Sequence, residues 1–159
     1  MLGLCGGYQM LGRMIHDPHG VEGEPGSRSG LDLLDCETTL ALEKQLKNVS
    51  GTLALPGAPA MAGYEIHMGI TSGPALAKPT VHLDDGRMDG AISADEKIFA
   101  SYCHGLFDHP EALTGLLTWA GMKPTMQVDL AARREQDIER LADAVEAAID
   151  WTKLSLPGF

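Results

Sequence analysis

The sequence predicts an α/β protein, in which short strands are followed by helices around one core. A glycine-flanked cysteine within residues 3–12 is typical of a sharp turn from a strand into a helix. Residues 63–71 alternate apolar and polar side chains, as a half-buried strand does. Residues 129–149 carry apolar side chains at helical spacing, which indicates an amphipathic helix.

The first of these patterns also points to chemistry. Cys5 lies two residues from Gly3 and two residues from Gly7, the spacing of a nucleophile elbow with cysteine in place of serine. A helix that begins at Cys5 would favour its thiolate, and the N–H of Gly6 would face a developing oxyanion. The same spacing also fits a glycine-rich turn around a buried structural cysteine, and it leaves both interpretations open.

The turn has very little chain before it. Only Met1 and Leu2 are available as its strand, although strands in globular proteins usually run ~5–6 residues. Either these residues pair briefly as a stub, or the chain is a piece of a longer protein, and we expect the second. No basic region with a long apolar stretch precedes Gly3, so no secretory signal is expected.

Composition limits the classes of function. With 159 residues, 44% of them hydrophobic, the chain is long enough to bury a core as one domain. Its net charge of −10 argues against nucleic-acid binding, and no apolar run approaches the ~20 residues of a membrane span. The widely spaced Cys5, Cys36 and Cys103 are typical of reduced thiols in the cytoplasm. His16 and His19 alone are a weak metal motif, and we expect no metal site.

Periodicity and turn residues predict the other elements. The helix after the turn is expected to end near Asp17, because a proline follows it. Strands are expected within residues 31–42, 45–55, 81–83, 91–92 and 98–103. Asp108 should cap a helix that has Pro110 in its first turn and Glu111 at the position of a capping box. That helix should end at Gly121.

Two histidines are candidates for the base that a cysteine nucleophile needs. Function in open α/β sheets collects at the carboxyl ends of strands, and His104 directly follows the strand expected at residues 98–103. His109 lies in a helix cap, where a capping role is more natural. In the alternating segment, Glu65 and His67 share one face, which fits either a site or a solvated polar face.

Five segments, in order along the chain, resemble the motifs of one family. They read GLCGGYQMLG at residues 3–12, DPHGVEG at 17–23, GLDLLD at 30–35, GYEIHMG at 63–69 and HGLFD at 104–108. The first resembles the nucleophile motif of class I glutamine amidotransferases. The ordered set resembles the carboxy-terminal domain of the cobyric acid synthase (CobQ) family, and it covers nearly the whole chain.

This resemblance implies a fold and a site. Residues 1–159 would form the carboxy-terminal part of a flavodoxin-like, three-layer amidotransferase domain that lacks its first strands. Cys5 would attack the side-chain amide of glutamine, His104 would act as general base and acid, and the N–H of Gly6 would stabilise the oxyanion. Substrate-binding or positioning roles are implied for four further motif residues, Gln9, Tyr64, Glu65 and His67.

The resemblance also implies partners. In the family, a separate amino-terminal domain uses ATP and Mg²⁺ to activate carboxylates of a corrinoid, adenosylcobyrinic acid a,c-diamide. Ammonia released from glutamine then converts the b, d, e and g carboxylates to amides. We therefore expect no cofactor in this chain, weak or no activity from the chain alone, and self-association that covers its open sheet edge.

Most class I amidotransferases follow their catalytic histidine with Pro-Glu, and the glutamate completes a triad. Here Gly105 and Leu106 follow His104, so the resemblance implies a Cys–His dyad, as in the CobQ-like branch. Two alternatives remain open. One is the glutaminase subunit of another CobQ-like ligase, such as one that amidates lipid II, and the other is a non-catalytic docking module that keeps the turn as scaffold.

Overall fold

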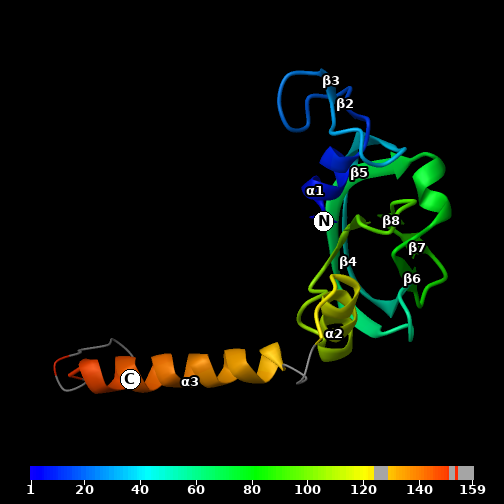
Figure 1. The fold of residues 1–159 in the computed structure, drawn as a ribbon. Helices are drawn as coiled ribbons and strands as arrows, with labels where there is room; N and C mark the ends of the chain where they lie inside the picture. Colours follow the sequence, from blue (N-terminus) through cyan, green and yellow to red (C-terminus); the bar gives the residue numbers. More distant parts are fainter. Residues whose placement is uncertain (124–128, 151–152, 154–159) are drawn as a thin grey trace. The chain divides into compact units, whose positions relative to one another are not determined.

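The computed structural model describes residues 1–123, 129–150 and 153. They divide into two compact units, residues 1–128 and residues 129–159. The described part of the first unit holds two sheets, helices α1 (Gly6–Leu11) and α2 (Pro110–Trp119) and the 3-10 helix η1 (Pro74–Ala77). The second unit contains helix α3 (Leu130–Ala148) (Figure 1). The mixture of sheets and helices confirms the predicted α/β class.

The sheets of the first unit are mixed in direction. The smaller has the order β1-β9-β8, with β1 (Leu2–Leu4), β9 (Phe99–Ser101) and β8 (Ala91–Ile92). The larger has the order β10-β5-β4-β2-β3, with β10 (Cys103–His104), β5 (Ala60–Ser72), β4 (Glu37–Leu53), β2 (Met14–Asp17) and β3 (Gly26–Ser29). β6 (Val81–Leu83) pairs with β4 and with β7 (Met88–Asp89). The β1–β9 and β2–β4 pairs are parallel, and the other described pairs are antiparallel.

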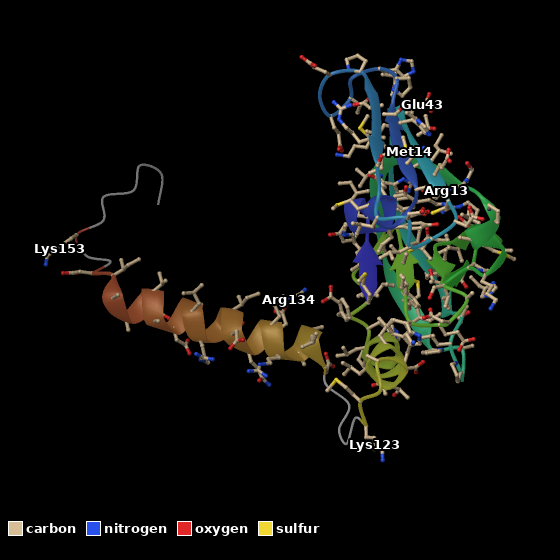
Figure 2. The ribbon with its side chains drawn as sticks, turned by 45° about the horizontal axis from the view of Figure 1, so that its top comes forward. Arg13, Met14, Glu43, Lys123, Arg134 and Lys153 are labelled. Carbon is tan, nitrogen blue, oxygen red and sulfur yellow. The ribbon has the colours of Figure 1, made fainter. Side chains whose placement is uncertain are left out.

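The two longest strands of the larger sheet, β4 and β5, pair as an antiparallel hairpin. β4 joins the two strands that were expected separately, and a bulge interrupts its pairing with β5 between Leu40 and Gln45. In Figure 1, β2 and β3 lie at one end of this unit and α2 lies at the opposite end. Figure 2 shows Glu43, within the bulge, at the same end of the unit as Met14 of β2.

The prediction that the first helix runs to Asp17 is wrong. α1 ends at Leu11, because Gly12 is extended and the Arg13 N–H donates to the Cys36 carbonyl at 2.8 Å. A Cβ at Gly12 would lie 2.7 Å from that carbonyl oxygen, so glycine permits this close approach. The chain then pairs as β2 between β3 and β4. Residues 31–34 are not a strand either, because the N–H groups of Leu33 and Leu34 donate to the Leu11 carbonyl at the end of α1. They satisfy a carbonyl that the helix end leaves free.

Helix α2 begins one residue later than expected. His109, not Asp108, is its N-cap, and Pro110 occupies the first helical position. The Glu111 carboxylate accepts a hydrogen bond from the Ala60 N–H at 3.2 Å, so it ties α2 to the start of β5 and forms no capping box. The expected stop is confirmed, since Gly121 follows the helix with a φ of +87°.

Helix α3 confirms the clearest periodicity of the sequence. Asp129 is its N-cap, and its carboxylate accepts a hydrogen bond from the Ala132 N–H at 2.9 Å. Ile138, Leu141 and Val145 lie on the helix with their side chains exposed. The described residues contain no helix that is long and apolar enough to cross a membrane.

Two apolar clusters form the core of the first unit. One gathers side chains of β4, β5, β6, β9 and α2, and its members include Leu53, Val81 and Phe99. The other lies around α1 and includes Tyr8, Leu11 and Tyr102. Burial of such side chains contributes ~1.5–3 kcal/mol each, so these clusters fix the two sheets against α1 and α2.

Candidate active site

Cys5 occupies a strained turn between β1 and α1. Its φ of 52° and ψ of −114° are rare for a residue with a Cβ, and such strain is found at functional sites. A Cβ at Gly3 would collide with the Leu11 side chain and lie 3.2 Å from the Gly7 carbonyl, so glycine at position 3 permits the tight turn. Cys5 is partly exposed, which does not fit the alternative of a buried structural cysteine.

Two contacts tie Cys5 to the strands beside it. Its backbone N–H donates to the Ser101 carbonyl at 2.9 Å, at the end of β9. Its thiol donates to the Ile66 carbonyl of β5, with Sγ 3.5 Å from the oxygen. The space beside Gly6 is open, because a Cβ at Gly6 would meet no described atom within 4 Å. Cys5 is therefore fixed at its backbone, and there is room next to it.

His104 lies on β10, where the chain has entered the larger sheet. The expected strand at residues 98–103 is in fact two strands in different sheets, and Tyr102 alone separates them. His104 is the register partner of Tyr64 in β5, and their rings stack with centroids 5.1 Å apart and planes 8° from parallel. The Nε2 atom of His104 is buried and has no hydrogen-bond partner among the described residues.

The strands bring Cys5 and His104 to the same part of the molecule. Ser101 accepts the Cys5 N–H and lies three residues before His104. Ile66 accepts the Cys5 thiol and lies two residues after Tyr64, the partner of His104. β5, β9 and β10 therefore hold both members of the expected dyad.

Gly63 allows β10 to lie close to β5. A Cβ at this position would collide with the His104 carbonyl oxygen, which is a backbone atom and cannot rotate away. Glycine before Tyr64 thus sets the approach of the histidine-bearing strand, a packing role that only the structure reveals.

Glu65 points into the protein. This excludes, for Glu65, the solvated polar face that the alternating pattern of residues 63–71 also allowed. Its side chain is 4% exposed, whereas the apolar Tyr64 and Ile70 of the same strand are 42% and 65% exposed. Arg87 donates to both carboxylate oxygens of Glu65, with distances of 3.1 Å and 2.8 Å. This bidentate pair raises the pKa of Arg87 above its ordinary value. Asp85, a second partner of Arg87, has a lowered pKa, chiefly through its hydrogen bond from Lys47.

His67 and Gln9 belong to a polar layer around Tyr102. The ring of His67 stacks on that of Tyr102 at 3.9 Å, and its Nδ1 hydrogen-bonds with the Gly69 carbonyl at 2.8 Å. The Tyr102 hydroxyl is hydrogen-bonded to Gln9 and, at 2.6 Å, to Thr71. Burial is the main cause that raises the pKa of Tyr102. Gln9 and His67 thus contact Tyr102, the residue between β9 and β10.

A cavity of about 570 Å³ lies beside this layer and is lined in part by Glu65, His67, Arg87 and Tyr102. Its lining does not include Cys5 or His104. The structure therefore separates the expected site residues into two groups. Cys5 is held by β5 and β9 and His104 stacks on Tyr64 of β5, whereas Glu65 and His67 line the cavity.

Sequence reasoning missed two residues of this region, Arg87 and Asp89. Asp89 is 8% exposed and accepts hydrogen bonds from the chain that precedes His104. The pairs Asp85-Gly86 and Asp89-Gly90 indicate turns, and nothing in that local pattern relates Arg87 or Asp89 to the distant Glu65 or His104. His109 caps α2, and its buried Nδ1 also has no partner among the described residues.

The described residues contain no group of three or more His, Cys, Asp or Glu side chains that could hold a metal ion. Comparison with protein families identifies the family of the chain. The model of the CobB/CobQ-like glutamine amidotransferase domain matches residues 1–112, which contain the turn at Cys5, the hairpin of β4 and β5, and His104. The match covers more than half of the chain, so the chain belongs to the CobB/CobQ-like family of glutamine amidotransferase domains.

Proposed function

We propose that this chain is the glutamine-hydrolysing part of cobyric acid synthase, which supplies the ammonia that the synthase uses. The observation that carries the proposal is the position of Cys5. It occupies a strained turn, with its backbone tied to the strand that leads to His104 and its thiol tied to the strand that pairs with His104. Because the chain belongs to a family of glutamine amidotransferase domains, we assign glutamine as the substrate of Cys5.

In the proposed reaction, the sulfur of Cys5 attacks the carbon of the glutamine side-chain amide, while His104 accepts the thiol proton. The N–H of Gly6 donates a hydrogen bond to the oxyanion. His104 then gives the proton to the leaving nitrogen, and ammonia departs as the thioester forms. Water, with His104 as base, cleaves the thioester and releases glutamate.

The other motif residues would position this machinery. Tyr64 stacks on His104 and limits the rotation of its ring. Gln9 and His67 contact Tyr102, which is two residues before His104. Glu65 is neutralised by Arg87, which suits it to hold β5 in place and not to transfer protons.

The wider reaction follows from the resemblance of the motifs at residues 63–69 and 104–108. Ammonia would convert the b, d, e and g carboxylates of adenosylcobyrinic acid a,c-diamide to amides in the cytoplasm. ATP and Mg²⁺ would activate those carboxylates in a separate amino-terminal domain, and no step assigned to Cys5 or His104 uses them. A protein that joins this chain to such a domain should amidate the corrinoid, and amidation of lipid II instead would contradict the assignment.

The glutaminase role is tested with a diazo-ketone analogue of glutamine, whose adduct is located by mass spectrometry. We expect one adduct, on Cys5, in the 159-residue chain or in a version extended at its amino terminus. Excess glutamine should protect Cys5, and the buried Cys36 and Cys103 are internal controls for general thiol reactivity. No adduct in either version would contradict the glutaminase role and favour a docking module.

A further inference from the structure

The chain changes sheets immediately before the proposed base. β9 ends at Ser101 in the smaller sheet, Tyr102 crosses between the sheets, and β10 begins at Cys103 in the larger one. A residue that crosses between sheets loses its ladder partners, and its buried N–H must be satisfied in another way. This crossing also carries the backbone of the site, because Ser101 accepts the Cys5 N–H and His104 follows Cys103.

The carboxylate of Asp89 holds this crossing. It accepts the Tyr102 N–H at 3.0 Å and the Ser101 hydroxyl at 2.5 Å. The Ser101 hydroxyl oxygen in turn accepts the Cys103 N–H at 2.9 Å. The Cys103 thiol is also hydrogen-bonded to Asp89. One buried carboxylate therefore contacts three consecutive residues between the two sheets.

Asp89 is itself rigidly placed. Its carbonyl accepts the Thr80 N–H at 2.9 Å and the Thr80 hydroxyl at 3.0 Å. The next residue, Gly90, has a φ of +77°, and a Cβ there would collide with Thr80 and with the Ala100 carbonyl. The backbone of Asp89 is thus fixed on both sides. Its carboxylate can therefore hold Ser101 and Tyr102 in a defined position.

We propose that Asp89 is a positioning residue whose carboxylate sets the backbone of residues 101–103 and thereby places His104 relative to Cys5. It touches neither of them through any described contact, so it acts through the crossing and not on the substrate. Most class I amidotransferases have Pro-Glu directly after this histidine, whereas Gly105 and Leu106 follow His104. Because that glutamate is missing, the orientation of the His104 ring depends more on the position of its own backbone. The catalytic consequence rests on the proposed glutaminase function, whereas the geometric one does not.

The test compares Asp89→Asn with Asp95→Asn. Asparagine has nearly the shape of aspartate, but it removes the negative charge that strengthens these hydrogen bonds. Its amide oxygen can accept at only one of the two oxygen positions, Oδ2 and Oδ1, on which the Ser101 and Tyr102 bonds converge, and its NH₂ group cannot accept at the other. Asp95 is a matched control, because it accepts the Ser93 hydroxyl at 2.6 Å in the exposed turn before β9 and does not contact the crossing. In a full-length protein that contains this chain, we expect Asp89→Asn to lower kcat for glutamine on the order of tenfold to a hundredfold with little change in KM, and Asp95→Asn to resemble the parent.

A purely structural role would lower stability without altering the chemistry of the site. The deciding readouts are therefore the pH profile of Cys5 alkylation by iodoacetamide and the NMR titration of the His104 ring. Both should shift in Asp89→Asn and stay unchanged in Asp95→Asn. Ser101→Ala removes the hydroxyl that donates to Asp89 and accepts the Cys103 N–H, but it leaves the bond from the Tyr102 N–H to Asp89. It should shift both readouts in the same direction by less, and it serves if Asp89→Asn does not fold.

The outcomes separate this inference from the proposed function. Unchanged kcat, alkylation profile and His104 titration in folded Asp89→Asn would overturn the positioning role, even if the diazo-ketone labels Cys5. If the diazo-ketone labels nothing but both profiles still shift in Asp89→Asn, the glutaminase role fails and the positioning role stands.

Discussion

The imidazole of His104 lies flat against the phenol ring of Tyr64, with ring centroids 5.1 Å apart and planes that differ by 8°. The same two residues are register partners in β10 and β5, so backbone and side chains hold them together. Gly63 contributes, because its missing Cβ leaves space for the His104 carbonyl. The stack is a physical restraint on the ring of a histidine that is followed by Gly105 and Leu106 and not by Pro-Glu.

Removing this restraint should slow catalysis without unfolding the protein. Tyr64→Ala leaves the His104 ring free to rotate, so we expect kcat for glutamine to fall about tenfold. Tyr64 is 42% exposed, so the loss of stability should stay near ~1 kcal/mol. Tyr64→Phe keeps the stacking ring and should retain most activity. Equal losses in both variants would show that the hydroxyl matters and not the stack.

The two nearby histidines should differ sharply when each is replaced by asparagine. His104→Asn removes the proposed proton carrier, and we expect glutaminase activity to fall by at least about a hundredfold. His109→Asn changes only the N-cap of α2, where asparagine is itself a favoured cap, so activity should stay near that of the parent. Steady-state glutamine hydrolysis by a full-length protein that contains this chain measures both. An inactive His109 variant beside an active His104 variant would reverse the assignment.

Local sequence was sufficient where the local backbone decides the structure. Gly3 permits the close packing of the turn at Cys5, and Asp129 caps the longest described helix, so both features could be predicted from their own segments. The stub of residues 2–4 pairs with β9, one of the two explanations considered for so short a strand.

Distant partners decide the features that could not be predicted. Glu65 is buried because Arg87, 22 residues later, neutralises it. The strand expected at residues 98–103 divides because Asp89 satisfies the backbone of Tyr102. Periodicity within a segment contains no information about such partners, which the fold alone brings together.

The ion pair of Glu65 and Arg87 should contribute more to the free energy of unfolding than the exposed ion pair of Lys47 and Asp85. Arg87→Met leaves a carboxylate that is 4% exposed without its bidentate partner, and we expect the free energy of unfolding to fall by about 3 kcal/mol. The double variant with Glu65→Gln should recover part of this loss, because no buried charge remains. Urea unfolding measures all three proteins.

Lys47→Met is the matched control for that variant. Lys47 donates to Asp85 at 2.7 Å, but its side chain is 58% exposed, so the loss should be about 0–1 kcal/mol. A loss in Lys47→Met as large as that in Arg87→Met would contradict the view that burial of Glu65 is the cause.

The Asp89 carboxyl gives the protein a stability that changes with pH in a direction unusual for an acid. Burial raises its pKa, the Glu65 carboxylate adds to the rise, and hydrogen bonds from Ser101, Tyr102 and Cys103 oppose it. In the unfolded chain the group titrates near ~3.9. Between that value and the raised pKa the folded protein binds more protons than the unfolded chain, so the free energy of unfolding falls as pH rises.

Asp89→Asn removes this contribution, so the stability of the parent relative to the variant should decrease as pH rises above ~3.9 and become constant above the raised pKa. Asp95→Asn should show the opposite sign. The Ser93 hydrogen bond lowers the pKa of Asp95, so its contribution is present above ~3.9 and is lost as pH falls through the lowered pKa. Urea unfolding of the three proteins across this range measures both differences. A difference between the free energies of unfolding of the parent and of Asp89→Asn that is constant or increases with pH would show that the Asp89 carboxyl is not held in a desolvated site. That result would also contradict the rigid placement on which the positioning of His104 depends.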